Sequence, residues 1–428
     1  MTKLSADNQH KRHKHTKCRI DICDRISYNV TMQLKKQLAL LIALILVQNC
    51  LSSGFGLYEM SAASHALGGA VVGQAVDGSA NYFNPATLSD MTNITVSAGF
   101  VTQHPRARIK VDGESGSSAL NPGVFWLPHL QLAVPLPAGF TFGLGSYVEC
   151  GLGSEYDNNW ALVNSSQETT VESLTINPNL SYAITDRWSV GAGIRFFYLD
   201  FDQDSQPIPG RVYNRLKGDT DFSDWGWQVG TRYRLFDNFA VGLVYKSMIN
   251  VNVDGKTQTD GAVNRWTSAM TDLDMPESIA GGFNWDITDT WHLGSAFTWT
   301  KWSTFDTLNF NLGGVNTPVH LNWVDTYRIA VAPSWDFAEH WTGMLSYAYE
   351  TDCTGDQEST MLPCADRHMI TSGLRWNCWE NLELALSYGI IIMDGRPSQA
   401  LDASGKMRHY CAYRGISHAV GFTITYRF

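Results

Sequence analysis

The chain has 428 residues, of which 44% are apolar, 12% aromatic and only 17% charged. Its net charge of -10 at pH 7 argues against nucleic acid as a partner. The length would fit two or three ordinary domains, but a large β-barrel of this size folds as one unit.

The first apolar run of the chain predicts export. "LALLIALILV" at 38–47 is shorter than the roughly 20 apolar residues that a membrane-crossing helix needs. It follows Lys35 and Lys36 and leads into small residues at 50–54, which is the layout of a secretory signal peptide. We therefore interpret 32–53 as a signal peptide.

The preceding segment, 1–31, contains the basic tract "HKRHKHTK" at 10–17. This tract either binds nucleic acid or metal, or lies upstream of the true start at Met32. We prefer the second interpretation, in which 1–31 is a non-native or extended leader.

The segment 54–92 is rich in Gly, Ala and Ser and carries Asn84, Pro85 and Ala86 near its end. Proline at this place excludes a central strand and breaks a helix. A disordered leader is one interpretation, but the segment has nine apolar side chains that require burial: Leu57, Met60, Leu67, Val71, Val72, Val76, Tyr82, Phe83 and Leu88. We therefore predict a compact plug.

From 93 to 428, apolar and polar residues alternate with period two. Leu180 and Tyr182 fall on one face of a strand, for example, and Asn179 and Ser181 on the other. Such alternation fits a soluble sandwich, whose apolar face packs on a second sheet, or an outer-membrane barrel, whose apolar face contacts lipid.

The connections between the strands favour the barrel. Short turns lie at 135–139, 185–187, 236–238, 286–290, 336–340 and 377–381, and longer segments lie near 103–125, 150–168, 202–222, 252–276, 306–324, 351–367 and 394–414. These connections join fourteen strands, an even number as bacterial barrels require. Seven tryptophans lie beside the short turns, as expected of an aromatic girdle at the membrane interface: Trp188, Trp285, Trp291, Trp335, Trp341, Trp376 and Trp379.

The predicted fold class is therefore all-β: a 14-stranded antiparallel transmembrane β-barrel over 93–428, plugged by the N-terminal segment. A barrel wider than about eight strands cannot fill its lumen with wall side chains alone, which is why a plug is needed.

Five cysteines follow the signal peptide: Cys150, Cys353, Cys364, Cys378 and Cys411. Cys353 and Cys364 lie in one expected outer loop and are candidates for a disulfide, since export leads to an oxidising compartment. We expect no metal site, because no Cys/His spacing suggests one, and no cofactor. The sequence offers no His/Ser pair in a recognisable setting, so we expect no enzyme.

Over 54–428 the chain resembles the long-chain fatty acid transporters of the Gram-negative outer membrane. The resemblance rests on "GFGLYEMSAASHALGGA" at 54–70, the Asn-Pro-Ala at 84–86, "GLGSEYDNNW" at 151–160 and the closing "AVGFTITYRF". It implies a barrel closed by an N-terminal hatch, here 54–92, that carries the Asn-Pro-Ala motif.

The resemblance also implies that the third strand bends inward and leaves a gap in the wall, near the Asn-Pro-Ala motif. We assign this bend to Gly151 and Gly153, with Gly143 and Gly145 before them, because glycine weakens a strand and marks a bulge. Ordinary barrel curvature, which also uses glycine, is the alternative.

Outer loops of the family capture substrate. Within 252–276, Val263, Trp266, Met270 and Leu273 lie at helical spacings and form either an external apolar groove or only the loop's own packing.

A fatty acid carboxylate would require a cation in the lumen, and Arg328 and Lys246 are the candidates. Arg328 shares a face with Ala330 and Ala332, so it is expected to point inward. The alternative for each cation is an ion pair with Asp or Glu.

The expected function is passive import of long-chain fatty acids by lateral diffusion through the gap. Uptake of other hydrophobic compounds, such as aromatic hydrocarbons or alkanes, is the close alternative. A general porin fits less well because of the apolar plug, and the modest loops give an adhesive barrel little support. We expect a monomer in the Gram-negative outer membrane, surrounded by its lipid and inserted by the barrel assembly machinery, for which Phe428 is a fitting terminal signal.

Overall fold

The computed structural model describes residues 56–428 apart from 116, 121–122, 158–159, 165, 210–211, 261–262, 313, 355–364, 403 and 405. The leader and signal peptide expected over 1–53 lie outside these residues. No helix in the described ranges is long and apolar enough to cross a membrane.

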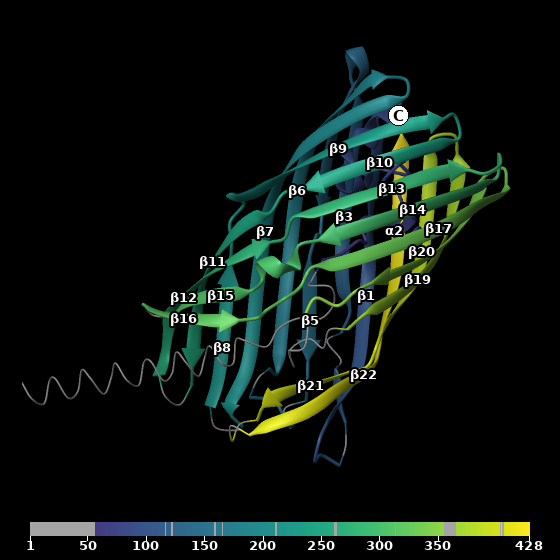
Figure 1. Ribbon diagram of the computed structural model, residues 1–428. Coiled ribbons are helices and arrows are strands. Elements are labelled where there is room, and N and C mark those ends of the chain that lie inside the picture. The colour runs from purple at the N-terminus through teal and green to yellow at the C-terminus, as the bar shows by residue number, and fades with distance from the viewer. Residues whose placement is uncertain are drawn as a thin grey trace, which may run out of the picture.

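Within the described residues, fourteen antiparallel strand positions form a closed ring, in which the last strand pairs with the first. Figure 1 shows the strands of this wall from the side. The predicted 14-stranded barrel is confirmed. One position in the ring, the third, is shared by β4 and β5. The wall consists of β1 (Thr95–Val111), β3 (Phe125–Pro135), β4 (Phe140–Tyr147), β5 (Gly151–Glu155), β6 (Glu168–Thr185), β7 (Trp188–Ile208), β9 (Asp224–Phe236), β10 (Phe239–Lys246), β13 (Ser278–Asp286), β14 (Trp291–Thr300), β17 (Thr326–Ala338), β18 (Trp341–Glu350), β19 (Arg367–Trp379), β20 (Leu382–Met393) and β22 (Met407–Arg427).

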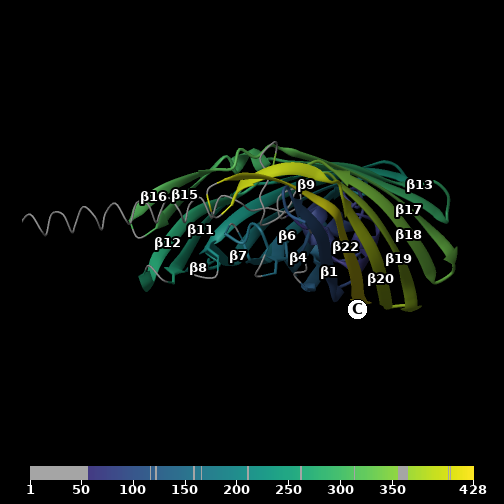
Figure 2. The same ribbon diagram turned by 90° about the horizontal axis from the view of Figure 1, so that it is seen from below.

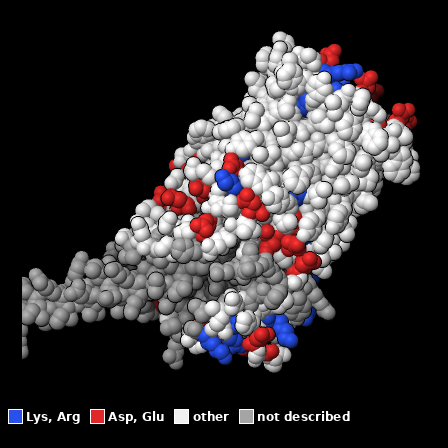
Figure 3. Space-filling view, in the orientation of Figure 1, with Lys and Arg blue, Asp and Glu red and all other residues white. Residues whose placement is uncertain are grey.

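The alternation of the sequence places polar side chains inside the barrel and apolar side chains outside. On β6, Asn177, Asn179 and Ser181 are buried, whereas Leu180 is 47% exposed. Figure 3 shows the result as a broad uncharged surface over β10, β13, β14 and β17, with charged groups at its two ends. Such a belt is the surface that a transmembrane barrel presents to lipid.

The short turns lie at one end of the barrel. The first wall strand begins and the last one ends at this same end, since Thr95 pairs with both Arg427 and Ala133. All seven predicted girdle tryptophans lie on the outer surface at this end and are more than a third exposed. Two pairs stack across neighbouring strands: the ring centroids of Trp291 and Trp335 are 5.3 Å apart, and those of Trp341 and Trp376 are 5.2 Å apart.

The longer connections differ from the expectation, because much of their length is strand. Among the described residues they contain β2 (Ser118–Leu120), β8 (Val212–Asp219), β11 (Ile249–Thr259), β12 (Val263–Met275), β15 (Thr307–Leu312), β16 (Val315–His320) and β21 (Arg396–Leu401). A wall strand needs only about 10 residues to cross the membrane, but β7 has 21. The hairpins therefore continue beyond the lipid, where pairing still satisfies the backbone groups.

The N-terminal residues before β1 lie inside the barrel, in purple within the curved wall of Figure 2. They form α2 (Ala62–Ala66), α3 (Ala80–Phe83) and the 3₁₀ helix η1 (Pro85–Asp90). Ser61 caps α2 by accepting from the Ser64 N–H, and Asn84 caps η1, with Pro85 at the first helical position. Two further 3₁₀ turns, η2 (Pro137–Gly139) and η3 (Trp302–Thr304), lie in connections.

This N-terminal segment crosses the lumen and contacts opposite sides of the wall. α2 packs against β18, β19, β20 and β22, whereas η1 packs against β4, β6, β7 and β9. Met60, Ala62, Ala66 and Leu88 are fully buried, so the apolar side chains of the segment form a core with the inner face of the barrel.

Candidate functional site

The third wall strand is interrupted where β4 ends at Tyr147 and β5 begins at Gly151. Strand β6 pairs with both parts: Tyr147 lies opposite Thr175, and Gly151 lies opposite Glu172. The three residues 148–150 therefore face the two residues 173–174. One extra residue is the arrangement of a β-bulge, which bends the strand that carries it.

The bend separates the third strand from its other neighbour. β3 pairs with β4 through Leu130–Pro135, and its outer part, Phe125–His129, pairs with β1 on the far side. Among the described residues, no pairing joins this outer part to β5. Pro128 lies there, and proline is tolerated in a strand mainly where its missing N–H leaves no ladder incomplete.

A cavity of about 460 Å³ lies at this gap. It is lined by Trp126, which is 62% exposed on the outer surface, and also by Arg367 and Ser417, which are buried inside the barrel. Because one cavity contacts both outward-facing and inward-facing side chains, it passes through the plane of the wall. Most of its other lining is apolar, including Leu127 and Ile391.

Of the four glycines assigned to the bend, two lie at it. Gly151 and Gly153 are in β5 directly after the interruption, and both line the cavity. The assignment of Gly143 and Gly145 is wrong, because both lie inside the regularly paired β4. A Cβ at Gly143 would overlap the Asn81 side chain, so these glycines make room for the N-terminal segment instead.

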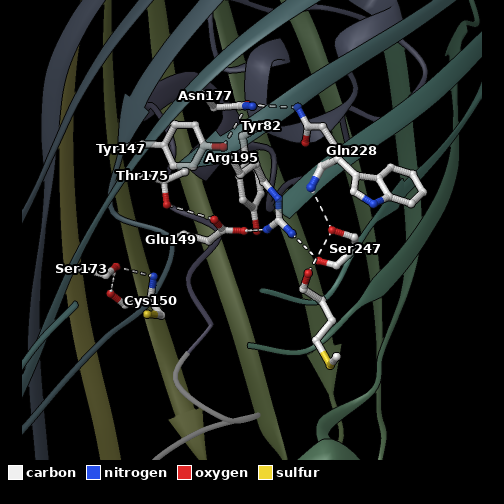
Figure 4. Close-up of polar contacts among 12 residues, drawn as sticks. Tyr82, Tyr147, Glu149, Cys150, Ser173, Thr175, Asn177, Arg195, Gln228 and Ser247 are labelled. Atoms are coloured by element: carbon white, nitrogen blue, oxygen red, sulfur yellow. Dashed lines mark hydrogen bonds and ion pairs between the residues drawn. The ribbon is translucent and has the colours of Figure 1, made fainter. Parts of the chain in front are cut away.

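The interruption itself is held from inside the barrel. Gly56 forms an isolated bridge with Cys150, and the Leu57 N–H donates to the Glu149 carbonyl at 3.0 Å. The Glu149 carboxylate forms an ion pair with Arg195 of β7 and accepts a 3.0 Å hydrogen bond from Thr175. Figure 4 shows Glu149 and Arg195 pointing toward one another beside Tyr147 and Tyr82.

The Asn-Pro-Ala motif lies elsewhere than expected. The Asn84 amide donates to the carbonyls of Val72, at 2.8 Å, and Thr231, at 3.1 Å. The Ala86 carbonyl accepts from Ser181 and Ser189 of β6 and β7. The motif is thus bound to β6, β7 and β9, and Gly56 and Leu57 are the N-terminal residues that meet the interruption.

Replacing Asn84 with alanine is expected to loosen the N-terminal segment without unfolding the wall. The change leaves the buried Val72 carbonyl and Ala86 N–H without their Asn84 partner, at a cost of about 1–3 kcal/mol for each unsatisfied group. Amide hydrogen exchange in 57–92 should accelerate, and the exposed neighbour Asn93→Ala should leave it unchanged. Equal exchange in both variants would show that the motif does not hold the segment.

Lys246 and Arg328 point into the lumen and are 7% and 3% exposed. They line a small second cavity of about 80 Å³, together with Arg195 and Glu149. The Lys246 Nζ lies 2.9 Å from the centroid of the Tyr82 ring. Arg328 donates to the Gly68 carbonyl at 2.8 Å and lies over the Tyr58 ring.

The predicted apolar groove rests on a helical spacing, and this spacing is wrong, because Val263–Met275 is the strand β12. With period two, Trp266 and Met270 share an exposed face, and Leu273 falls on the opposite face, against the buried core. Strand pairing with β11 overrides the spacing of three and four.

The structure describes only one of the two cysteines of the candidate disulfide. Cys353 is buried within a cluster of apolar side chains. Cys364 lies outside the described residues.

Known proteins resemble this chain in sequence and in fold. Residues 43–428 match the family described as outer membrane protein transport protein (OMPP1/FadL/TodX). A long-chain fatty acid transport protein of Escherichia coli O6:H1 is 24% identical, over 93% of this chain and 99% of that protein.

Two solved structures share the fold. A FadL homologue of Pseudomonas aeruginosa matches with a TM-score of 0.77 at 20% identity, over 88% of this chain and 100% of that one. The toluene transporter TodX of Pseudomonas putida matches with a TM-score of 0.68 at 15% identity, over 87% and 99%.

Proposed function

Because the chain belongs to the OMPP1/FadL/TodX family of outer membrane transport proteins, we propose that it imports long-chain fatty acids passively and releases them sideways through the gap between β3 and β5. The protein is an outer-membrane transport protein and not an enzyme, as expected. The choice of substrate and the lateral route are the new elements of the proposal.

The observation that carries the lateral route is the cavity at the gap. It joins buried lumen residues to Trp126 and Leu174 on the lipid-facing side, and no pairing joins β3 to β5 there among the residues that the structure describes. An apolar chain gains free energy by moving from a protein cavity into lipid without passing through water. A sideways exit therefore suits a hydrophobic substrate better than an aqueous pore does.

The N-terminal segment is proposed to act as the hatch. It fills the lumen between opposite walls, so a solute that enters from outside meets it before the short-turn end. The buried apolar side chains of this segment argue against an open, charged constriction of the porin type. The same proposal has the chain working as a monomer, with the exposed terminal Phe428 read by the assembly machinery.

Fatty acids are preferred over hydrocarbons because of the charges at the small cavity. Two guanidinium cations, Arg195 and Arg328, line it together with the amine of Lys246 and one carboxylate, Glu149. A carboxylate head group is attracted by this excess of positive charge, whereas toluene or an alkane is indifferent to it. The relatives include proteins named for each class of substrate.

The test is uptake of labelled oleate and labelled toluene by cells that lack their own importer and express residues 32–428. Changing Lys246 and Arg328 together to methionine should lower oleate uptake several-fold, the effect expected from losing charge-assisted contacts. Toluene uptake should stay unchanged. Uptake of toluene alone by the unaltered protein would assign it to the hydrocarbon branch, and uptake of neither compound by a folded barrel would overturn the proposal.

A further inference from the structure

Arg367 carries a buried guanidinium cation that does not line the small cavity of Lys246 and Arg328. Arg367 begins β19, is 6% exposed and lines the 460 Å³ cavity at the gap. Its Nε and Nη2 atoms are buried, and neither has a hydrogen-bond partner within the described part of the chain. Burying such donors unsatisfied is costly, so this arrangement calls for an acceptor.

Two carboxylates lie near Arg367, and neither forms an ion pair with it. Glu350 lies opposite both Arg328 and Arg367 in the sheet, but none of the ion pairs within 4.0 Å among the described residues joins it to Arg367. Glu59 accepts from the Tyr58 N–H, and burial raises the pKa of Glu59, although the nearby charges of Arg328 and Arg367 act against this rise.

The remaining neighbours of Arg367 in the cavity are suited to an acyl chain. Ile391 and Met393 lie on the next strand, β20, and Leu127 and Phe125 lie on β3. At the opposite side, Trp126 is exposed on the outer surface, and the half-buried Leu174 lies on the outward face of β6. The cavity thus has a cation at its inner end and apolar walls toward the membrane.

We propose that Arg367 binds the carboxylate of a fatty acid whose acyl chain lies in this cavity and enters the membrane through the gap, so that the substrate leaves tail first. This inference rests on the proposed function and adds a binding group and a direction to it. A monocarboxylate fits Arg because its planar fork offers two parallel N–H donors.

The experiment compares oleate with oleyl alcohol, which has the same chain and no charge, in cells that lack their own importer. Arg367→Met should lower the initial rate of oleate uptake by about tenfold, the loss expected for one charge-assisted contact. The rate for oleyl alcohol should change less than about twofold. Arg367→Lys keeps the charge and should restore part of the oleate rate.

Arg375→Met is the matched control, because Arg375 lies on the same strand, away from the cavity, with its Nη2 donating to Thr342. It should leave both rates unchanged. Equal losses for oleate and alcohol in a folded Arg367→Met barrel would overturn the inference, and so would no loss for either. Uptake of neither compound by the unaltered protein would instead overturn the proposed function.

Glu350→Gln gives a second route if Arg367→Met fails to fold. It removes the carboxylate that shares the sheet position of Arg367, so the ratio of oleate to oleyl alcohol uptake should rise. An unchanged or lower ratio would contradict the role of Arg367.

Discussion

Replacing Gly151 with tryptophan is expected to reduce uptake to the level of cells without the protein. Gly151 lines the cavity at the gap, and it lies opposite the outward-facing Glu172. A Cβ at Gly151 would come no closer than 3.4 Å to a neighbouring side chain, Leu57, so a side chain can begin there without a clash. The indole would then fill the space between β3 and β5, through which we propose that the substrate leaves.

Gly281→Trp is the control for this blocking variant. Gly281 lies on β13 opposite Leu243, which is 52% exposed to lipid, and its neighbouring atoms are no closer than 3.6 Å. The control protein should fold and transport normally, as judged by heat-modifiable electrophoretic mobility and oleate uptake. Full uptake by a folded Gly151→Trp barrel would show that substrate does not pass through the gap.

Replacing Gly191 and Gly242 together with valine is expected to expel the N-terminal segment and open the pore. A Cβ at Gly191 would lie 2.5 Å from the Pro85 carbonyl carbon, and one at Gly242 would overlap the Val72 carbonyl. Both contacts are with backbone, which cannot rotate away as a side chain can. Valine is favoured in strands such as β7 and β10, so we expect the N-terminal segment, and not the wall, to move.

Planar-bilayer recording tests this second prediction. The double variant should give steady open-pore currents and let hydrophilic antibiotics into cells, whereas the unaltered protein and Gly281→Val should not. Steady currents from the unaltered protein would instead favour a general porin. A folded double variant that gives no current would show that the N-terminal segment stays in the lumen despite the overlap.

The wall could be predicted from the sequence because its pattern is local. Which way Leu180 or Asn179 faces depends only on its parity along the strand and on whether the outside is lipid. The girdle tryptophans follow for the same reason, since each short turn marks one end of the barrel. Parity also identifies Arg195 and Arg367 as inward cations, although composition alone does not single them out from other arginines.

The position of the Asn-Pro-Ala motif could not be predicted, because it depends on contacts far along the chain. Asn84 reaches the Thr231 carbonyl, 147 residues away, and only the folded barrel brings the two together. The assignment of Gly143 to the bend was wrong for the same reason. In a single sequence, a glycine that opens space for Asn81 cannot be distinguished from a glycine that bends a strand. The helical spacing in 263–273 failed because pairing between neighbouring strands outweighs the periodicity of a short segment.

The seam between β1 and β22 has a consequence for assembly. Ser97 and Thr425 are hydrogen-bonded at 2.9 Å across it, although they are 328 residues apart, and such distant contacts form late and slowly. Ala62 of α2 donates to Thr423 on the same final strand, whereas η1 rests on β4, β6, β7 and β9. The η1 half of the segment can therefore pack on strands made early, whereas its α2 half needs β18, β19, β20 and finally β22, which are the last strands of the wall. Ring closure and the completion of the plug are therefore coupled, and a barrel caught before closure would lack both the β1–β22 seam and the last contact of α2.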